Sequence, residues 1–216
     1  MSHVAAPRKE LGIKTIFNFL GPLSSPAKPQ RMVVGVYSVK VGQLMAESLA
    51  LIGGLEEALV VCGHGGLDEV RFASFYFLLK FDPVYQQMHS QISPEGPTNV
   101  WHVRTNLSST TLTTDLSTSI EEYTVNPSDF GIPNHKLAEC IGSTPSNNAQ
   151  LLVELLENKL NPRHPVLDFV LLNSAALLVV SGKARGWIEG VEIARESIRG
   201  GRALKVLQDY IRATNS

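Results

Sequence analysis

A strand, a helix and a second strand follow one another early in the chain, and this order constrains the fold most. Residues 32–37 form a short apolar run rich in valine, which is typical of a strand buried on both faces of a parallel sheet. Residues 41–51 carry apolar side chains at helical spacing before a Gly-Gly pair. Residues 58–62 form another buried strand. The three elements predict a βαβ unit with parallel strands and a right-handed crossover.

The remaining elements complete an α/β prediction. Residues 99–103 and 120–125 predict two shorter strands, joined by a loop rich in serine and threonine. The C-terminal third predicts helices at residues 144–157, 164–181, 188–199 and 203–213. The predicted fold class is therefore α/β, with a mainly parallel sheet flanked by helices and a short antiparallel extension from residue 99 to residue 125.

Composition excludes several classes of protein. The 216 residues are long enough to bury a core without disulfides, and Cys62 and Cys140 form no CxxC motif. Nineteen Lys and Arg against 20 Asp and Glu give no electrostatic footprint for nucleic acid or an acidic membrane. The first residues lack the apolar region of a signal peptide, and Asp168 interrupts the longest apolar stretch. We expect a soluble cytoplasmic protein with no nucleic-acid or membrane partner.

The densest chemistry is the segment GHGGLDE, residues 63–69, directly after the second predicted strand. Ligands of open α/β sheets bind beyond the carboxyl ends of the strands. Asp68 and Glu69 offer the oxygen ligands that Mg²⁺ prefers, and the glycines allow the backbone to approach a ligand closely. The alternative is a glycine turn with a solvated acidic flank. His64 lies beside the carboxylates, and we assign it no acid or base role.

A basic segment near the N-terminus is the second candidate. Arg8 and Lys9 open the run RKELGIKTIFNFLGPL, in which Gly21-Pro22 ends an apolar helical turn. Arginine binds carboxylates or phosphates in bidentate fashion. Taken alone, a basic cluster near a terminus is usually a solvated face.

Several separated motifs together resemble one family, the anthranilate phosphoribosyltransferases. The motifs are RKELGIKTIFNFLGPLSSPA, ALVVCGHGGLDE, ISPEGPTNVWHV, DFGIP, LLNSAALL and EGVEIARESIRGGRALKVL. They occur in the family's order and cover nearly the whole chain. The resemblance implies a catalytic domain of the nucleoside phosphorylase and phosphoribosyltransferase type, with residues 1–216 as its C-terminal part.

The resemblance also implies a reaction and a set of binding residues. The phosphoribosyl group of PRPP is transferred to anthranilate, giving N-(5-phosphoribosyl)anthranilate and pyrophosphate in tryptophan biosynthesis. By resemblance, Asp68 and Glu69 hold Mg²⁺ against the PRPP diphosphate, and Arg8 contacts the anthranilate carboxylate. No residue is assigned as a catalytic acid, base or nucleophile, because the amine of anthranilate is already nucleophilic.

Two features set this chain apart from the family. Members of the family begin with a helical domain, and their GTGGD loop and KHGNR segment together cradle PRPP. None of these three features occurs in the 216 residues. We expect the family's homodimer surface to be lost with that domain. Residues 70–91 form an insertion with six aromatic side chains and a single acidic one. Its removal restores the family's spacing, which fits either a translated intron or a genuine additional loop.

Other interpretations remain open at this stage. The chain is either part of a phosphoribosyltransferase, an inactive fragment that needs its missing half in trans, or a relative of the pyrimidine-nucleoside phosphorylases. The segment GIKTIFNFLGPL argues against the last of these. Asn173 is expected to be a paired core amide, Trp101 and Trp187 packing residues, and Cys62 a small apolar side chain.

Overall fold

The computed structural model describes residues 17–36, 38–63, 91–107, 116–140 and 142–215, in two compact units. The first unit contains all four described strands and the helices that pack with them. The second contains Ser93–Gly96 and the chain from Asn126 onward. The described strands all lie in the first unit, and the described elements of the second unit are helices.

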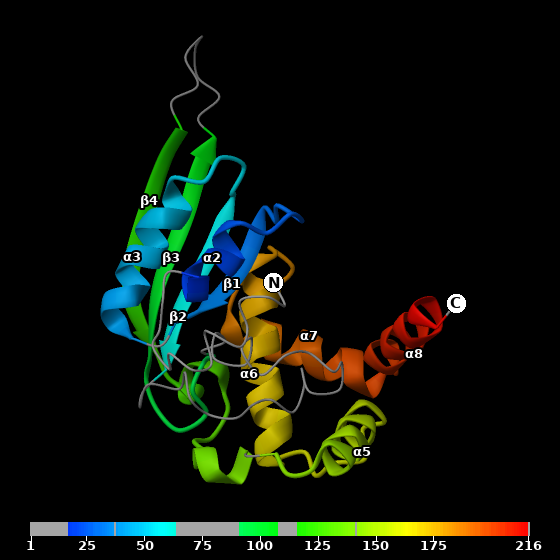
Figure 1. Ribbon diagram of the computed structural model, residues 1–216. Coiled ribbons are helices and arrows are strands. Elements are labelled where there is room, and N and C mark those ends of the chain that lie inside the picture. Colours follow the sequence, from blue (N-terminus) through cyan, green and yellow to red (C-terminus); the bar gives the residue numbers. More distant parts are fainter. Residues whose placement is uncertain (1–16, 37, 64–90, 108–115, 141, 216) are drawn as a thin grey trace, which may run out of the picture. The chain divides into compact units, whose positions relative to one another are not determined.

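A four-stranded sheet forms the centre of the first unit (Figure 1). Its strands are β1 (Arg31–Gly35), β2 (Glu57–Gly63), β3 (Thr98–Leu107) and β4 (Leu116–Val125), paired in that order. β1 and β2 are parallel, as the βαβ pattern predicts. β3 is antiparallel to both β2 and β4. The prediction of a mainly parallel sheet is therefore wrong for the described residues, and the sheet is mixed.

The physical reason lies in the connections between the strands. Strands β3 and β4 are each 10 residues long, longer than predicted, and only residues 108–115 join them. A parallel pair needs a crossover of about a dozen residues or more, so this connection permits only an antiparallel hairpin. The predicted antiparallel extension is thus half of the described sheet rather than a short addition to it.

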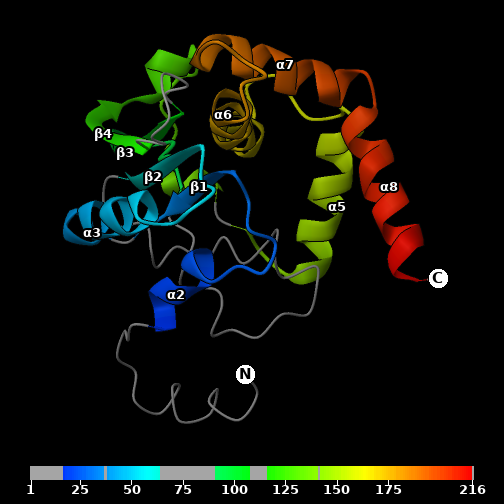
Figure 2. The same ribbon diagram turned by 90° about the horizontal axis from the view of Figure 1, so that it is seen from above.

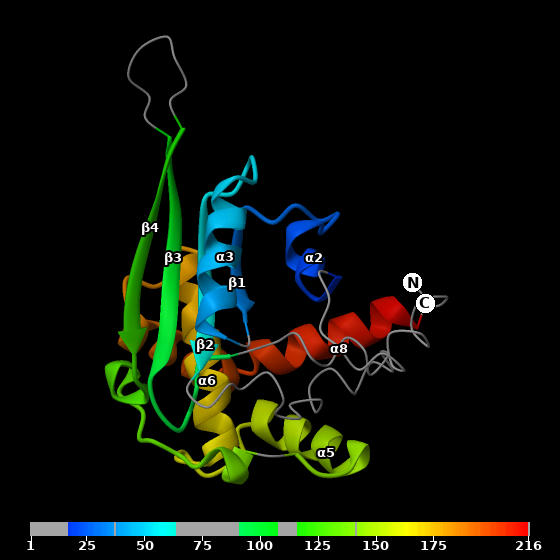
Figure 3. The same ribbon diagram turned by 60° about the vertical axis from the view of Figure 1, so that its left-hand side comes forward.

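Helix α3 (Val39–Ala50) covers one face of the sheet (Figure 3). Its apolar residues Met45, Ala46 and Leu49 are buried in one cluster with side chains of β1, β2 and β3. Among these, Trp101 and Val103 of β3 are almost fully buried. The short helix α2 (Phe17–Leu23) contacts α3. The expectation that Trp101 and Cys62 are packing residues is confirmed, since both belong to this core.

Close contact between α3 and Trp101 depends on Gly42. A Cβ atom at this position would lie 2.6 Å from Cε3 of the buried indole ring, closer than real Cβ atoms approach other atoms. Gly42→Ala should therefore lower the free energy of unfolding by about 1–3 kcal/mol, although alanine is the better helix former. Urea denaturation measures this loss. Gly53→Ala is the matched control, because a Cβ atom there meets nothing within 4 Å.

The elements that the structure describes in the second unit are helices (Figure 2). They are η3 (Pro127–Phe130), η4 (Leu137–Cys140), α5 (Pro145–Leu156), α6 (Pro165–Val180), α7 (Trp187–Arg199) and α8 (Arg202–Thr214). α5 begins where predicted, because Thr144 accepts a hydrogen bond from the backbone N–H of Asn147 and proline follows it. Gly201, with a φ of 69°, separates α7 from α8.

Helix α6 is the apolar centre of the second unit. Eight of its 16 residues are buried, and α7 packs against it with Gly190 over Ala175. Asn173 donates to the backbone oxygen of Phe169 at 3.1 Å, and Trp187 packs against Phe130 with ring centroids 5.0 Å apart. Both side chains therefore have the structural roles expected of them. No helix in the described part of the chain is long and apolar enough to cross a bilayer.

Candidate functional site

The predicted binding residues Arg8, Asp68 and Glu69 lie outside the described part of the chain. Their roles in binding anthranilate and Mg²⁺ stay predictions. His64 and residues 70–90 of the insertion lie outside it as well. The described residues themselves contain no group of three or more His, Cys, Asp or Glu side chains that could hold a metal ion.

The structure does describe the strand that leads into residues 64–69, which contain Asp68 and Glu69 and which we call the predicted metal turn. β2 ends at Gly63, directly before His64, and lies parallel to β1. The turn therefore follows the carboxyl end of a parallel pair, where α/β proteins bind their ligands. Burial raises the pKa of the Cys62 thiol, which lies one residue before the strand end. This thiol is not a thiolate nucleophile at neutral pH.

The motif ISPEG, which follows the insertion, is held by a short segment of the second unit. The backbone N–H of His135 donates to the oxygen of Pro94 at 2.8 Å, and Asn134 donates to the oxygen of Glu95 at 3.3 Å. The Glu95 carboxylate accepts from the backbone N–H of Leu137 at 3.3 Å. The backbone of Ser93–Gly96 is therefore fixed through contacts with residues 134–137.

A buried carboxylate anchors that segment in turn. Asp168, in the first turn of α6, is 2% exposed and contacts His135 Nε2 at 2.8 Å through Oδ2. Its Oδ1 lies 3.7 Å from Nη2 of Arg195 on α7. A buried charge needs such partners, and removal of one leaves an uncompensated group. The motifs ISPEG and LLNSAALL, distant in sequence, are thus connected through His135 and α6.

Burial also decides the chemistry of the second cysteine. Cys140 is buried at the end of η4, and burial raises the pKa of its thiol to about 11. The neighbouring carboxylates of Glu139, Asp168 and Glu95 act in the same direction. Cys140 is therefore protonated at neutral pH, and it belongs to the core rather than to a reactive site.

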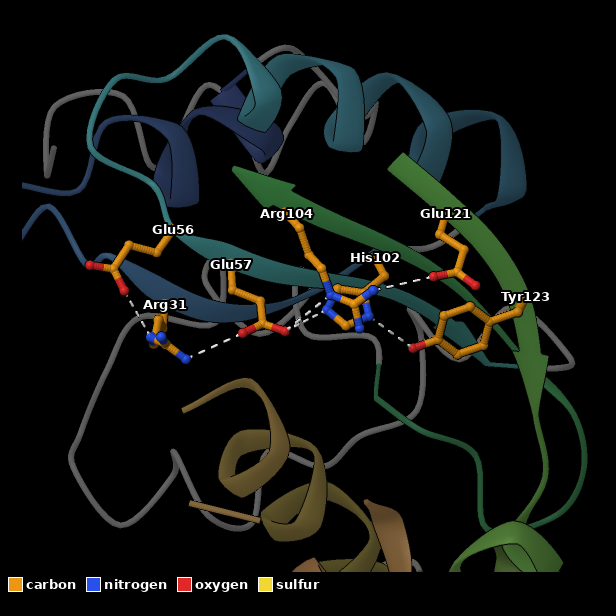
Figure 4. Close-up of polar contacts among 7 residues, drawn as sticks. All are labelled: Arg31, Glu56, Glu57, His102, Arg104, Glu121 and Tyr123. Atoms are coloured by element: carbon orange, nitrogen blue, oxygen red, sulfur yellow. Dashed lines mark hydrogen bonds and ion pairs between the residues drawn. The ribbon is translucent and has the colours of Figure 1, made fainter. Parts of the chain in front are cut away.

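A group of seven polar side chains in the first unit has its centre at the amino end of β2 (Figure 4). We call it the strand-end cluster, and it consists of Arg31, Glu56, Glu57, His102, Arg104, Glu121 and Tyr123. Glu57 is its centre. One carboxylate oxygen lies 2.7 Å from His102 Nε2 and 3.6 Å from Arg104 Nε, and the other accepts from Arg31 at 3.2 Å. The cluster connects all four strands.

The remaining contacts extend the cluster to its two ends. Arg31 donates to Glu56 at 3.0 Å, and Arg104 donates to Glu121 at 3.3 Å. His102, 3% exposed, lies 3.3 Å from the Tyr123 hydroxyl through Nδ1. A neutral imidazole protonated on Nε2 satisfies both of its contacts, because it donates to Glu57 and accepts from Tyr123.

The strand-end cluster is a structural element rather than a reactive centre. Burial raises the pKa of Tyr123 to about 12, so its hydroxyl stays protonated. Arg31 and Arg104 are both committed to carboxylates. Glu57 opens β2 and Gly63 ends it, so the centre of the cluster lies at the amino end of this strand, roughly 20 Å from its carboxyl end.

This cluster was not predicted from the sequence. Glu57, His102 and Arg104 stand in predicted or flanking strand positions, but their convergence depends on the register. Arg104 is paired with Glu57, and Glu121 with His102. The alternation of His102 and Arg104 along one strand is a signal that these residues share a face.

Burial of His102 predicts a dependence of stability on pH. Burial lowers the pKa of His102, and the opposing effect of its hydrogen bond to Glu57 is smaller. The unfolded chain then binds the proton more readily than the folded chain, so acidification below about pH 6.5 should lower the free energy of unfolding. This loss should level off once the pH is below the pKa of the folded protein.

His102→Gln should remove that part of the pH dependence. Urea denaturation of both proteins from about pH 7.5 to about pH 5 gives the two slopes. Tyr123→Phe is the control: it removes one hydrogen bond and keeps the titrating imidazole, so the slope should remain. Equal slopes for the wild type and His102→Gln would contradict the assignment.

Comparison with known proteins identifies the family of this chain. The sequence model of the a/b domain of the glycosyl transferase family matches residues 1–97 and 84–204. The chain is 40% identical over 210 residues to the anthranilate phosphoribosyltransferase of Schizosaccharomyces pombe. This match covers 97% of the chain and 49% of that protein.

Solved structures give the same result. The anthranilate phosphoribosyltransferase of Saccharomyces cerevisiae in complex with PRPP and Mg matches with a TM-score of 0.76 and 32% identity, over 100% of this chain and 51% of that one. The same enzyme in complex with 4-fluoroanthranilate matches with a TM-score of 0.74 and 34% identity, over 100% of this chain and 52% of that one. The chain thus spans about half the length of the relatives it matches.

Proposed function

Because the chain belongs to the glycosyl transferase family and corresponds to the C-terminal half of an anthranilate phosphoribosyltransferase, we propose that it takes part in that transfer reaction. The C1–oxygen bond between the ribose of PRPP and its diphosphate breaks. A bond forms between C1 and the amine nitrogen of anthranilate, which loses a proton, and pyrophosphate leaves. The observation that carries this proposal is the likeness along the whole chain to enzymes of that name.

The predicted metal turn supplies the charge chemistry. Asp68 and Glu69 are adjacent carboxylates beyond the carboxyl end of β2, and such oxygen donors fit Mg²⁺. We propose that they hold the ion against the diphosphate. When bound, Mg²⁺ stabilises the negative charge that gathers on the leaving group. The carboxylates cannot contact a phosphate directly, because they carry the same charge.

Binding of the acceptor is assigned to Arg8. A guanidinium donates two parallel hydrogen bonds to a carboxylate, which fixes both the position and the orientation of anthranilate. Orientation of the amine toward the ribose is the main requirement, since aromatic amines need no strong base to attack. The proposal therefore gives Arg8 a positioning role on the acceptor.

Arg8→Ala tests this role in an enzyme completed with its other half. The variant should raise the KM for anthranilate about ten- to a hundredfold, because a charge-assisted hydrogen bond contributes roughly 1.5–3 kcal/mol. The KM for PRPP should change far less. Steady-state kinetics with each substrate varied in turn measures both, and Lys9→Ala is the matched control. An equal loss for both substrates would contradict the assignment.

The experiment that tests the function itself is complementation. The N-terminal half of the S. pombe enzyme is co-expressed with the 216-residue chain, and the purified mixture is supplied with PRPP, Mg²⁺ and anthranilate. Loss of anthranilate fluorescence reports the transfer. Absence of turnover, or phosphorolysis of thymidine instead, would overturn the proposed reaction in favour of an inactive chain or a nucleoside phosphorylase.

A further inference from the structure

One continuous stretch of chain connects β2 to β3, and the predicted metal turn belongs to it. β2 ends at Gly63 and β3 begins at Thr98, which is the register partner of Gly63 in the sheet. Strand pairing therefore fixes both ends of this stretch. Ser93–Gly96, close to its second end, belongs to the second unit and makes its described contacts there.

We infer that Glu95 and His135 are positioning residues for the predicted metal turn, and that they act through the backbone of Ser93–Gly96. The inference rests on the proposed function, because that proposal assigns the metal ion to this turn. Neither side chain needs to touch the ion, since each acts on the chain that leads back from the turn to β3.

Ser93–Gly96 is held by its backbone and by two of its side chains. The oxygen of Pro94 accepts from the backbone N–H of His135 at 2.8 Å. The Glu95 carboxylate, although exposed, accepts from the backbone N–H of Leu137 at 3.3 Å. The hydroxyl of the fully buried Ser93 accepts from the backbone N–H of Glu95 at 3.2 Å. These contacts fix the segment against the loop that carries His135 and Leu137.

That loop is itself tied to two helices of the second unit. His135 Nε2 lies 2.8 Å from Oδ2 of Asp168, which is 2% exposed in the first turn of α6. Oδ1 of Asp168 lies 3.7 Å from Nη2 of Arg195 on α7, and Arg195 also donates to the oxygen of Pro162 at 3.3 Å. Metal ligands are positioned best when the groups that support them are tied to such rigid elements.

The insertion decides how strongly the held segment acts on the predicted metal turn. Without residues 70–91, Ile92 follows Glu69 directly and Ser93 is the second residue after it. A ligand must be held within about 0.5 Å of its productive position, so a fixed segment two residues away restricts it strongly. With the insertion, Glu69 and Ser93 are 24 positions apart. The same hydrogen bonds then restrict Glu69 far less.

The test is a double-mutant cycle between Glu95→Ala and deletion of residues 70–91, in the enzyme completed with the N-terminal half of the S. pombe protein. Mn²⁺ is the probe, and electron paramagnetic resonance of the free ion gives its dissociation constant without turnover. In the deletion variant, Glu95→Ala should weaken Mn²⁺ binding about fivefold, less than the ten- to hundredfold expected for a group that contacts a metal ligand. In the full chain it should weaken binding less than about twofold, because the insertion separates the two sites.

Three further variants separate positioning from charge and from stability. Glu95→Gln keeps an oxygen that accepts from Leu137 N–H, so it should retain the affinity that Glu95→Ala loses. His135→Ala removes the contact with Asp168 and should repeat the effect of Glu95→Ala. Thr144→Ala removes the cap of α5 in the same unit, and should lower the melting temperature without changing Mn²⁺ affinity. If His135→Ala is unfolded, the variants of the exposed Glu95 decide.

The outcomes separate this inference from the proposed function. Equal weakening by Glu95→Ala with and without the insertion, weakening in neither, or equal weakening by Glu95→Gln would overturn the positioning role. Unchanged Mn²⁺ binding in Asp68→Asn with Glu69→Gln would overturn it as well, because the ion then binds elsewhere. The expected Mn²⁺ affinities without turnover support the positioning role and contradict the function. Turnover with Mn²⁺ affinity independent of Glu95 does the reverse.

Discussion

Replacement of Asp68 by Asn and Glu69 by Gln should lower turnover of the completed enzyme by a few hundredfold at limiting Mg²⁺. The expectation follows from the position of the two carboxylates beyond the carboxyl end of β2, where they are proposed to hold the ion. Loss of one strong electrostatic contact to a developing charge costs about 3–4 kcal/mol of transition-state stabilisation. The amides keep the size of the side chains and remove their charge.

The dependence on Mg²⁺ distinguishes a metal ligand from a structural residue. Turnover of the double variant should recover in part as Mg²⁺ is raised, because weaker ligands still bind the ion at higher concentration. The matched control is Glu121→Gln with Glu122→Gln, another adjacent acidic pair, which should leave both turnover and Mg²⁺ dependence unchanged. Wild-type activity of the Asp68 and Glu69 variant at limiting Mg²⁺ would contradict the metal role.

Local patterns predicted most elements of the fold. The apolar runs that become β1 and β2, and the cap at Thr144 that begins α5, depend on nearest neighbours in the sequence. The direction of β3 did not follow from such patterns. Its apolar run is equally compatible with a parallel or an antiparallel neighbour, and the register that pairs Trp101 with Val60 is a long-range property.

The polar contacts show more clearly that local patterns do not predict long-range pairings. Asp168 reads as an interruption of an apolar helix, and its partners His135 and Arg195 are 33 and 27 residues away in the sequence. Glu57 and His102 are 45 residues apart. Motifs are visible within a short window of sequence, in which Asp68 and Glu69 are neighbours. Clusters that the sheet register and helix packing assemble are not visible in such a window.

The 216-residue chain alone should show no detectable transfer of phosphoribosyl to anthranilate. PRPP needs several backbone and cationic donors around its diphosphate. The resemblance places these donors in the half of the family's enzymes that this chain does not span. Two carboxylates cannot replace such a cradle, because they reach phosphate only through a metal ion. Addition of the N-terminal half should restore turnover, followed by loss of anthranilate fluorescence.

The insertion at residues 70–91 should lower the soluble yield and the turnover even of the completed enzyme. It places six aromatic side chains directly after Glu69, and metal ligands need tight positioning to bind well. Its deletion should raise both the soluble yield and turnover with the N-terminal half present, and should leave the chain alone inactive. The control keeps the length and replaces the aromatic residues Phe72, Phe75, Tyr76, Phe77, Phe81 and Tyr85 by Ser.

Comparison of the two variants separates the effect of aromatic surface from that of loop length. If serine replacement restores solubility but not turnover, the length of the segment disturbs Glu69. If it restores both, the aromatic side chains alone are responsible.

Turnover by the unmodified chain without its other half, at about 1 s⁻¹ or faster, would overturn the requirement for complementation.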